Sequence, residues 1–302
     1  MRIAFLMICL VCAPVFCIQP PAALAEGLAP MPVAVGILPQ RFFVEKIGGN
    51  LVEVEVMVPP GATPEQYEPK PRQMEALSRS RIYFACGVPF ETIWLPRMVS
   101  ANDKIVVIHT EKDIKKRAIE SHSDHVETAK TGAHAHEGPD DPHVWLSPPL
   151  VMLQARSIFE ALAAEDPRNR SSYETNYKAF VSELVDLDLY ISRIFATVPK
   201  PALFMVFHPA WGYFADAYGL KQVPVEVEGK EPKAKELDEF IKQARELGAK
   251  AIFVQPQYSP RSAQIVADAV GGGLVEADDL APDWDKNLRQ VAGQIAAASG
   301  KR

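Results

Sequence analysis

The stretch "NRSSYETNYKAFVSELVDLDLYISRIFAT", residues 169–197, determines how the rest of the chain can be arranged. Its apolar residues recur at alternating steps of three and four, which is the spacing of one face of an α-helix. That face comprises Tyr173, Tyr177, Phe180, Leu184, Leu187, Ile191 and Ile194. The sequence "VPKP" that follows ends the helix. A helix of this length extends roughly 40 Å, at 1.5 Å per residue, and can cross the whole back of a two-lobed protein.

Short apolar stretches alternate with helical patterns on both sides of this helix. The strands predicted before it are "PVAVGILP", "GNLVEVEVMVPPG", "RIYFACGV" and "KIVVIHT", and those predicted after it are "PALFMVF", "AKAIFVQP" and "GLVEADDL". Strands that alternate with helices are typical of parallel α/β sheets. The chain is therefore predicted to be α/β, with one lobe over residues 26–165, a linker helix over 166–198 and a second lobe over 199–302.

The first 25 residues have the pattern of a cleavable signal peptide. Arg2 precedes the apolar run "IAFLMICLVCAPVFCI", and "ALA" forms a small-x-small cleavage site before Glu26. A proline interrupts the run, and its cysteines lack the small-residue pair that lipidation requires, so a membrane anchor is not favoured. Cleavage leaves Cys86 as the single cysteine, which predicts a secreted protein without internal disulfides.

Composition limits the classes of partner. The chain has 302 residues, of which 48% are hydrophobic and 23% charged, so it can bury a sizeable core. Its net charge is -6 and it contains no basic stripe, which argues against nucleic-acid binding. A cationic ligand would not be repelled.

Four candidate metal ligands lie at the ends of predicted strands or in the loops beyond them. They are Glu65 in "PPGATPEQYEP", His143 in "DPHVWLSP", His208 in "VFHPAWGYFA" and Asp278 in "VEADDLAP". Ligands gather at the carboxyl ends of strands in open α/β sheets, so two residues from each lobe could converge in the cleft between the lobes. Each also has an ordinary explanation: a solvated glutamate, two hydrogen-bonded structural histidines and an aspartate that caps a helix.

Histidines are concentrated just before His143. Residues 112–141 have no apolar periodicity and are predicted to form a long exposed loop. This loop contains His122, His125, His134 and His136. With the neighbouring carboxylates they could form a weak zinc site, or they could be incidental in a disordered insert; the local enrichment favours weak metal capture.

Six blocks of the sequence occur in an order that resembles one known family. They are "PPGATPEQYEPKP", "GVPFETIWL", "DPHVWLSP", "FHPAWGYFADAYGL", "EPKAKEL" and "IFVQPQYSP". Across nearly the whole mature chain, these blocks resemble the metal-specific solute-binding proteins of ABC importers. The resemblance implies two α/β lobes with central parallel sheets, joined by one long rigid helix, with the metal site in the interlobe cleft.

The resemblance also implies that Glu65, His143, His208 and Asp278 are the metal ligands. Glu65 stands where the family usually has histidine, and "ADDL" replaces the family's "LDPL" around Asp278. Gln255 replaces the acid of the usual "EPQ". Two neutral imidazoles and two carboxylates would carry a net charge of about -2, which balances a divalent cation.

The implied function is that of a periplasmic protein, acting as a monomer, that captures Zn²⁺ and delivers it to the permease and ATPase of an ABC-type importer. His-rich loops at this position accompany the zinc members of the family, whereas the carboxylate of Glu65 is a harder ligand that favours Mn²⁺ or iron(II). A secreted zinc hydrolase with Glu65 as general base is less favoured, because the chain has no HExxH motif and no nucleophile elbow. An adhesion protein with the same fold remains open.

Overall fold

The computed structural model describes residues 29–120, 139–200, 202–225 and 233–299. The predicted signal peptide and the four loop histidines, His122, His125, His134 and His136, lie outside the described residues. Among the helices that are described, none is long and apolar enough to cross a membrane.

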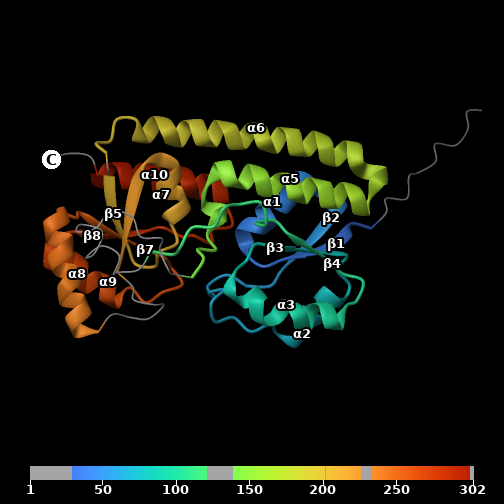
Figure 1. The fold of residues 1–302 in the computed structure, drawn as a ribbon, viewed down its shortest axis with the longest axis horizontal. Coiled ribbons are helices and arrows are strands. Elements are labelled where there is room, and N and C mark those ends of the chain that lie inside the picture. The colour runs from blue at the N-terminus through green and yellow to red at the C-terminus, as the bar shows by residue number, and fades with distance from the viewer. Residues whose placement is uncertain (1–28, 121–138, 201, 226–232, 300–302) are drawn as a thin grey trace, which may run out of the picture.

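The N-terminal lobe contains a four-stranded parallel sheet in the order β2-β1-β3-β4. Its strands are β1 (Met31–Val35), β2 (Val52–Val56), β3 (Ile82–Ala85) and β4 (Val106–His109). Its helices are α1 (Leu38–Gly48), α2 (Pro71–Ser78), α3 (Pro89–Ala101) and α5 (Pro148–Glu165). Helices α1 and α5 cover one face of the sheet, and α2 and α3 cover the other (Figure 1).

The C-terminal lobe repeats this arrangement with the strand order β6-β5-β7-β8, again parallel throughout. Its strands are β5 (Ala202–Val206), β6 (Leu220–Pro224), β7 (Ala251–Val254) and β8 (Gly273–Glu276). Its helices are α7 (Gly212–Tyr218), α8 (Ala234–Leu247), α9 (Arg261–Val270) and α10 (Trp284–Ser299). The prediction of two parallel α/β lobes is therefore confirmed.

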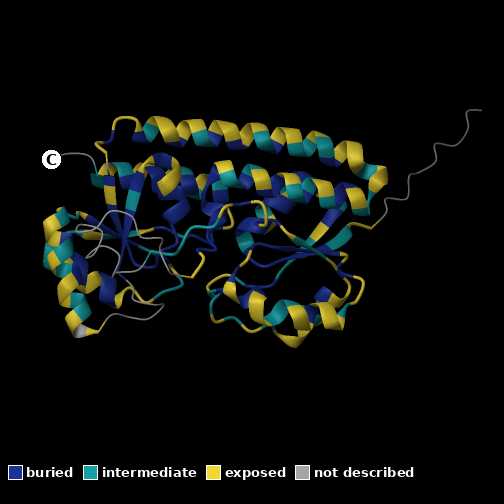
Figure 2. Cartoon of the chain, in the orientation of Figure 1, coloured by how far each residue is buried: buried dark blue, intermediate teal, exposed yellow. Residues whose placement is uncertain are grey.

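Helix α6 (Arg170–Phe195) runs along both lobes, as Figure 1 shows. Its outer face is exposed and its inner face is buried against the lobes (Figure 2). The buried residues are Tyr173, Phe180, Leu184, Leu187, Ile191 and Phe195. Burial of this apolar stripe supplies the driving force that holds the helix against both lobes.

A second connection between the lobes is formed by two tryptophans. Trp284 at the start of α10 packs edge-on against Phe43 of α1, with ring centroids 5.0 Å apart. The indole N–H of Trp284 donates to the backbone carbonyl of Trp145 (2.8 Å), and the indole N–H of Trp145 donates to the carbonyl of Asp279 (2.7 Å). Both tryptophans are fully buried, so the segment before α5 and the segment after β8 are held together.

The ends of the predicted exposed loop, residues 112–141, are in fact packed against the protein. Ile114 is 5% exposed and clusters with Val144 and with Tyr213 of α7. Ala118 and Asp140 form an antiparallel bridge that closes residues 117–120 and 139–141 into a stem. The prediction of a long exposed loop over 112–141 is therefore wrong for Ile114 and Asp141, which are buried, because the stem packs against the C-terminal lobe.

Candidate metal centre

Glu65 lies in the loop between β2 and α2. The backbone N–H of Phe90, at the start of α3, donates to the carbonyl of Pro64 (3.0 Å) and fixes the position of this loop. The Glu65 side chain is 30% exposed, yet its Oε2 is buried and has no hydrogen-bond partner among the described residues. A buried carboxylate oxygen without a partner costs free energy, and a bound cation would remove that cost.

His143 is held by the carboxylate of Asp141. Asp141 Oδ1 accepts hydrogen bonds from the backbone N–H of His143 (3.0 Å) and from its Nδ1 (2.8 Å). Because Nδ1 is the donor to a carboxylate, Nε2 presents its lone pair on the opposite side of the ring. The ring is 2% exposed and packs against Trp145, with centroids 5.1 Å apart.

His208 follows β5 and is fixed through its backbone. Its N–H donates to Oε1 of Gln255 (3.3 Å), and Nε2 of Gln255 donates to its carbonyl (3.0 Å). The imidazole stacks on Tyr258 with centroids 5.0 Å apart and an interplanar angle of 21°. Gln255, which stands where the family that the sequence resembles usually has an acid, therefore fixes the backbone of His208 through two hydrogen bonds.

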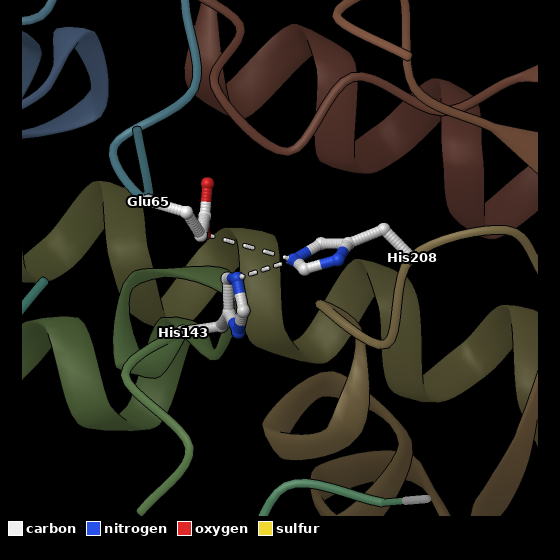
Figure 3. Close-up of side chains that lie close together, drawn as sticks. All are labelled: Glu65, His143 and His208. Carbon is white, nitrogen blue, oxygen red and sulfur yellow. Dashed lines mark hydrogen bonds and ion pairs between the residues drawn. The ribbon is translucent and has the colours of Figure 1, made fainter. Parts of the chain in front are cut away.

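These three side chains converge between the lobes, as Figure 3 shows. The Nε2 atoms of His143 and His208 are 3.3 Å apart, and Oε1 of Glu65 is 3.9 Å from Nε2 of His208. One potential ligand atom from each residue lies within 4.8 Å of the other two. Two imidazole nitrogens and a carboxylate oxygen grouped this closely are a donor set that suits a divalent transition metal.

Asp278, the fourth predicted ligand, is not part of this cluster. Its Oδ1 accepts from Nε2 of Gln257 (2.8 Å) and from the backbone N–H of Leu280 (3.0 Å). It lines a cavity of about 230 Å³ that lies between the two lobes. The carboxylate is thus engaged in a local turn.

The neighbouring Asp279 is likewise outside this group of three, but its carboxyl is buried. It is 5% exposed, and its Oδ1 is buried with no hydrogen-bond partner in the described part of the chain. Burial raises the pKa of Asp279 from 3.8 to about 6; His143 and His208 act in the opposite direction, and the charges of Asp278 and Glu65 add to the rise. Asp279 therefore interacts electrostatically with all three residues of the cluster.

Two carboxylates near the cluster carry no prediction in the sequence analysis. Asp279 is the second acid of the "ADDL" block, in which either carboxylate could face inward. Asp141 stands two residues before His143, a spacing that lets a carboxylate reach the ring nitrogen, and this signal was available in "DPHVW".

Comparisons with known proteins agree with this geometry. The family model described as "Zinc-uptake complex component A periplasmic" matches residues 33–298. The high-affinity zinc uptake system protein ZnuA of Bacillus subtilis is 29% identical over 248 residues, which are 79% of this chain and 75% of the relative. The manganese ABC transporter substrate-binding lipoprotein PsaA of Streptococcus pneumoniae is 27% identical over 270 residues, which are 82% of this chain and 83% of the relative.

A solved structure extends the likeness to three dimensions. The crystal structure of a ZnuA protein superposes with a TM-score of 0.81 at 40% sequence identity, covering 90% of this chain and 100% of the other. The match of the family model extends through both lobes and includes every residue of the cluster. The chain therefore belongs to the ZnuA family of metal-binding solute-binding proteins of ABC transporters, a family of binding proteins rather than enzymes.

Proposed function

We propose that this protein captures zinc outside the cytoplasm and delivers it to the permease and ATPase of an ABC-type importer. The observation that carries the proposal is the pair of imidazole Nε2 atoms, 3.3 Å apart between the lobes. Two buried oxygens, from Glu65 and Asp279, have no hydrogen-bond partner among the described residues and would supply the remaining negative charge. Zinc accepts such nitrogen and oxygen ligands in tetrahedral geometry.

The ligand set that we propose is Glu65, His143, His208 and Asp279. Asp279 takes the place predicted for Asp278, because the Oδ1 of Asp278 is already used by two local donors. Two carboxylates and two neutral imidazoles balance a divalent charge, so burial of the loaded site costs little. Four protein ligands leave no open position for an activated water, which favours storage and transfer over hydrolysis.

Manganese or iron(II) is the alternative cargo. Relatives that bind manganese include PsaA, and the carboxylate of Glu65 is a harder ligand than the histidine it replaces. Zinc is favoured because affinity rises along the divalent series towards copper and zinc for a given set of ligands. The histidines His122, His125, His134 and His136 are proposed to act as an accessory site that captures zinc weakly.

The remaining parts of the proposal concern the cellular location of the protein and its oligomeric state. The pattern of residues 1–25 supports export through a cleavable signal peptide into the periplasm. We propose that the exported chain acts as a monomer. The three clustered side chains all belong to one chain, so the proposed site does not need a second copy.

The proposal is tested by competitive titration of the metal-free protein with zinc and manganese. His143→Ala and His208→Ala should each weaken zinc binding severely, because each removes a ligand. His109→Ala is the matched control, since that half-exposed histidine pairs with Glu111 and is not part of the cluster, and it should leave affinity unchanged. Wild-type affinity in both site variants would refute the assignment of the site, and metal-dependent hydrolysis of esters or peptides would refute the binding function.

A further inference from the structure

The side chain of Arg117 is surrounded by carboxylates from three segments of the chain. Its Nη1 lies 3.1 Å from Oδ2 of Asp141, its Nη2 lies 2.9 Å from Oε1 of Glu120, and its Nε lies 3.0 Å from Oδ2 of Asp216. The three nitrogens of the guanidinium are thus each directed at a different carboxylate. Burial lowers the pKa of Arg117, but the charges of Glu120, Asp216 and Asp141 outweigh it and the net shift is upward.

Arg117 is linked to His143 of the proposed metal site through one intermediate residue, Asp141. Asp141 uses Oδ2 to accept from Arg117 and Oδ1 to accept from the backbone N–H and Nδ1 of His143. The Asp141 side chain is fully buried, and its backbone N–H donates to the carbonyl of Arg117 (2.8 Å). The carboxylate therefore cannot turn towards His143 in another orientation without losing its bond to the guanidinium.

The protein leaves space for this arrangement at Gly212. A Cβ atom at that position would lie 1.5 Å from Nη1 of Arg117 and 2.8 Å from Oδ2 of Asp141. The close approach of the guanidinium explains why the first residue of α7 has no side chain.

The same contacts join the two lobes. Arg117 belongs to the stem that follows β4, whereas Tyr213 and Asp216 belong to α7 of the C-terminal lobe. The backbone N–H of Arg117 donates to the hydroxyl of Tyr213 (3.1 Å), which in turn donates to the carbonyl of Asp141 (3.1 Å). The position of Asp141 is consequently set by contacts with both lobes.

We propose that Arg117 is a positioning residue for metal binding, which fixes Asp141 and thereby aims the imidazole of His143 when the stem is seated on α7. This inference rests on the proposed function, because it assumes that His143 binds the metal. A carboxylate that orients a metal-binding histidine is a general device, and loss of such a partner typically weakens metal affinity about 10–100-fold. Here the orienting carboxylate is itself oriented by an arginine from the stem.

The decisive experiment is a double-mutant cycle measured with zinc and a chromogenic chelator on the full chain. Arg117→Ala should weaken zinc affinity about tenfold or more, and Asp141→Asn should weaken it by a similar factor. The double variant should lose little more than either single variant, since both changes interrupt one chain of contacts. Co²⁺ absorption should show the same altered ligand field in all three variants.

Two further variants separate positioning from folding. Gly212→Ala keeps every charge but displaces the guanidinium, so it should also weaken zinc affinity. This variant tests the inference if Arg117→Ala does not fold. Arg156→Ala removes an exposed arginine paired with Glu160 on α5 and should leave affinity unchanged. Wild-type zinc affinity in Arg117→Ala or Gly212→Ala, or fully additive losses in the cycle, would overturn the inference. A wild-type protein that binds no zinc would instead refute the proposed function.

Discussion

Replacement of Asp279 by asparagine is expected to stabilise the metal-free protein and to weaken zinc binding. The carboxyl of Asp279 is buried, and its Oδ1 has no hydrogen-bond partner among the described residues. Asparagine has nearly the same shape but carries no charge, so Asp279→Asn removes the cost of holding an ionised carboxylate in this environment. The same change removes a negative ligand from the proposed site.

The size of the effect follows from the pKa of Asp279, which burial raises from 3.8 to about 6. A group whose pKa is higher in the folded state favours folding when protonated, and that stability is lost as pH rises from about 4 through about 6. A rise of about two pKa units corresponds to a loss of about 3 kcal/mol at pH 7. Asp279→Asn should recover up to that amount at pH 7 and very little near pH 4.

Urea unfolding of the metal-free protein, followed by tryptophan fluorescence at pH 4.5 and pH 7.5, measures this difference. Asp278→Asn is the control, because asparagine can still accept from Gln257 and Leu280 through its side-chain oxygen. It should change the unfolding free energy by less than about 1 kcal/mol and leave zinc affinity intact. The reasoning is refuted if Asp279→Asn destabilises the metal-free protein at pH 7.5, or if Asp278→Asn abolishes zinc binding while Asp279→Asn retains it.

Three other changes test separate parts of the account. Glu65→His should shift the preference further towards zinc in a zinc–manganese competition, because imidazole is a softer ligand than carboxylate; an unchanged ratio would remove Glu65 from the ligand set. Deletion of residues 121–138 should lower only the extra zinc stoichiometry in calorimetry, and loss of the tight site would make that segment the principal binder. Burial raises the pKa of Glu91 to about 7, so the free energy of unfolding falls as pH rises from about 5 to 7. Glu91→Gln should make the fall of the urea midpoint with pH shallower, and an unchanged pH dependence would contradict this reasoning.

The long helix could be predicted because its signal is local. Periodic apolar residues identified α6 within a few positions, and Tyr173, Leu184 and Ile191 are buried as expected. At the end of the helix the buried residue is Phe195 rather than the predicted Ile194, which is half-buried. A small drift of the helical face over seven turns accounts for this, because 3.6 residues per turn does not repeat with an integer period.

The proposal of Asp279 in place of Asp278 rests on the fold and not on the sequence. Strand alternation ends with β8 at Glu276, so it does not determine which of the next carboxylates faces inward. The backbone of this segment is held by the indole of Trp145, from the other lobe, which donates to the carbonyl of Asp279. That contact joins residues 134 positions apart, and no local pattern reports it.

The role of Arg117 was hidden for a similar reason. It lies in a stretch without apolar periodicity, which predicted an exposed loop rather than a packed stem. Its partners Asp141 and Asp216 are distant in the sequence, and only backbone pairing of the stem brings them together. His143 and His208, in contrast, lie beside distinctive apolar and proline-containing blocks that made them visible in the sequence alone.

Zinc K-edge X-ray absorption on protein loaded with one equivalent of zinc tests the central claim most directly. The account predicts four ligands, two of them imidazoles and two carboxylate oxygens, at about 2.0–2.2 Å. The spectrum should lose one imidazole contribution in His143→Ala and likewise in His208→Ala. A spectrum that shows sulfur, or that is the same in the wild type and both variants, would contradict the assignment of zinc to the interlobe site.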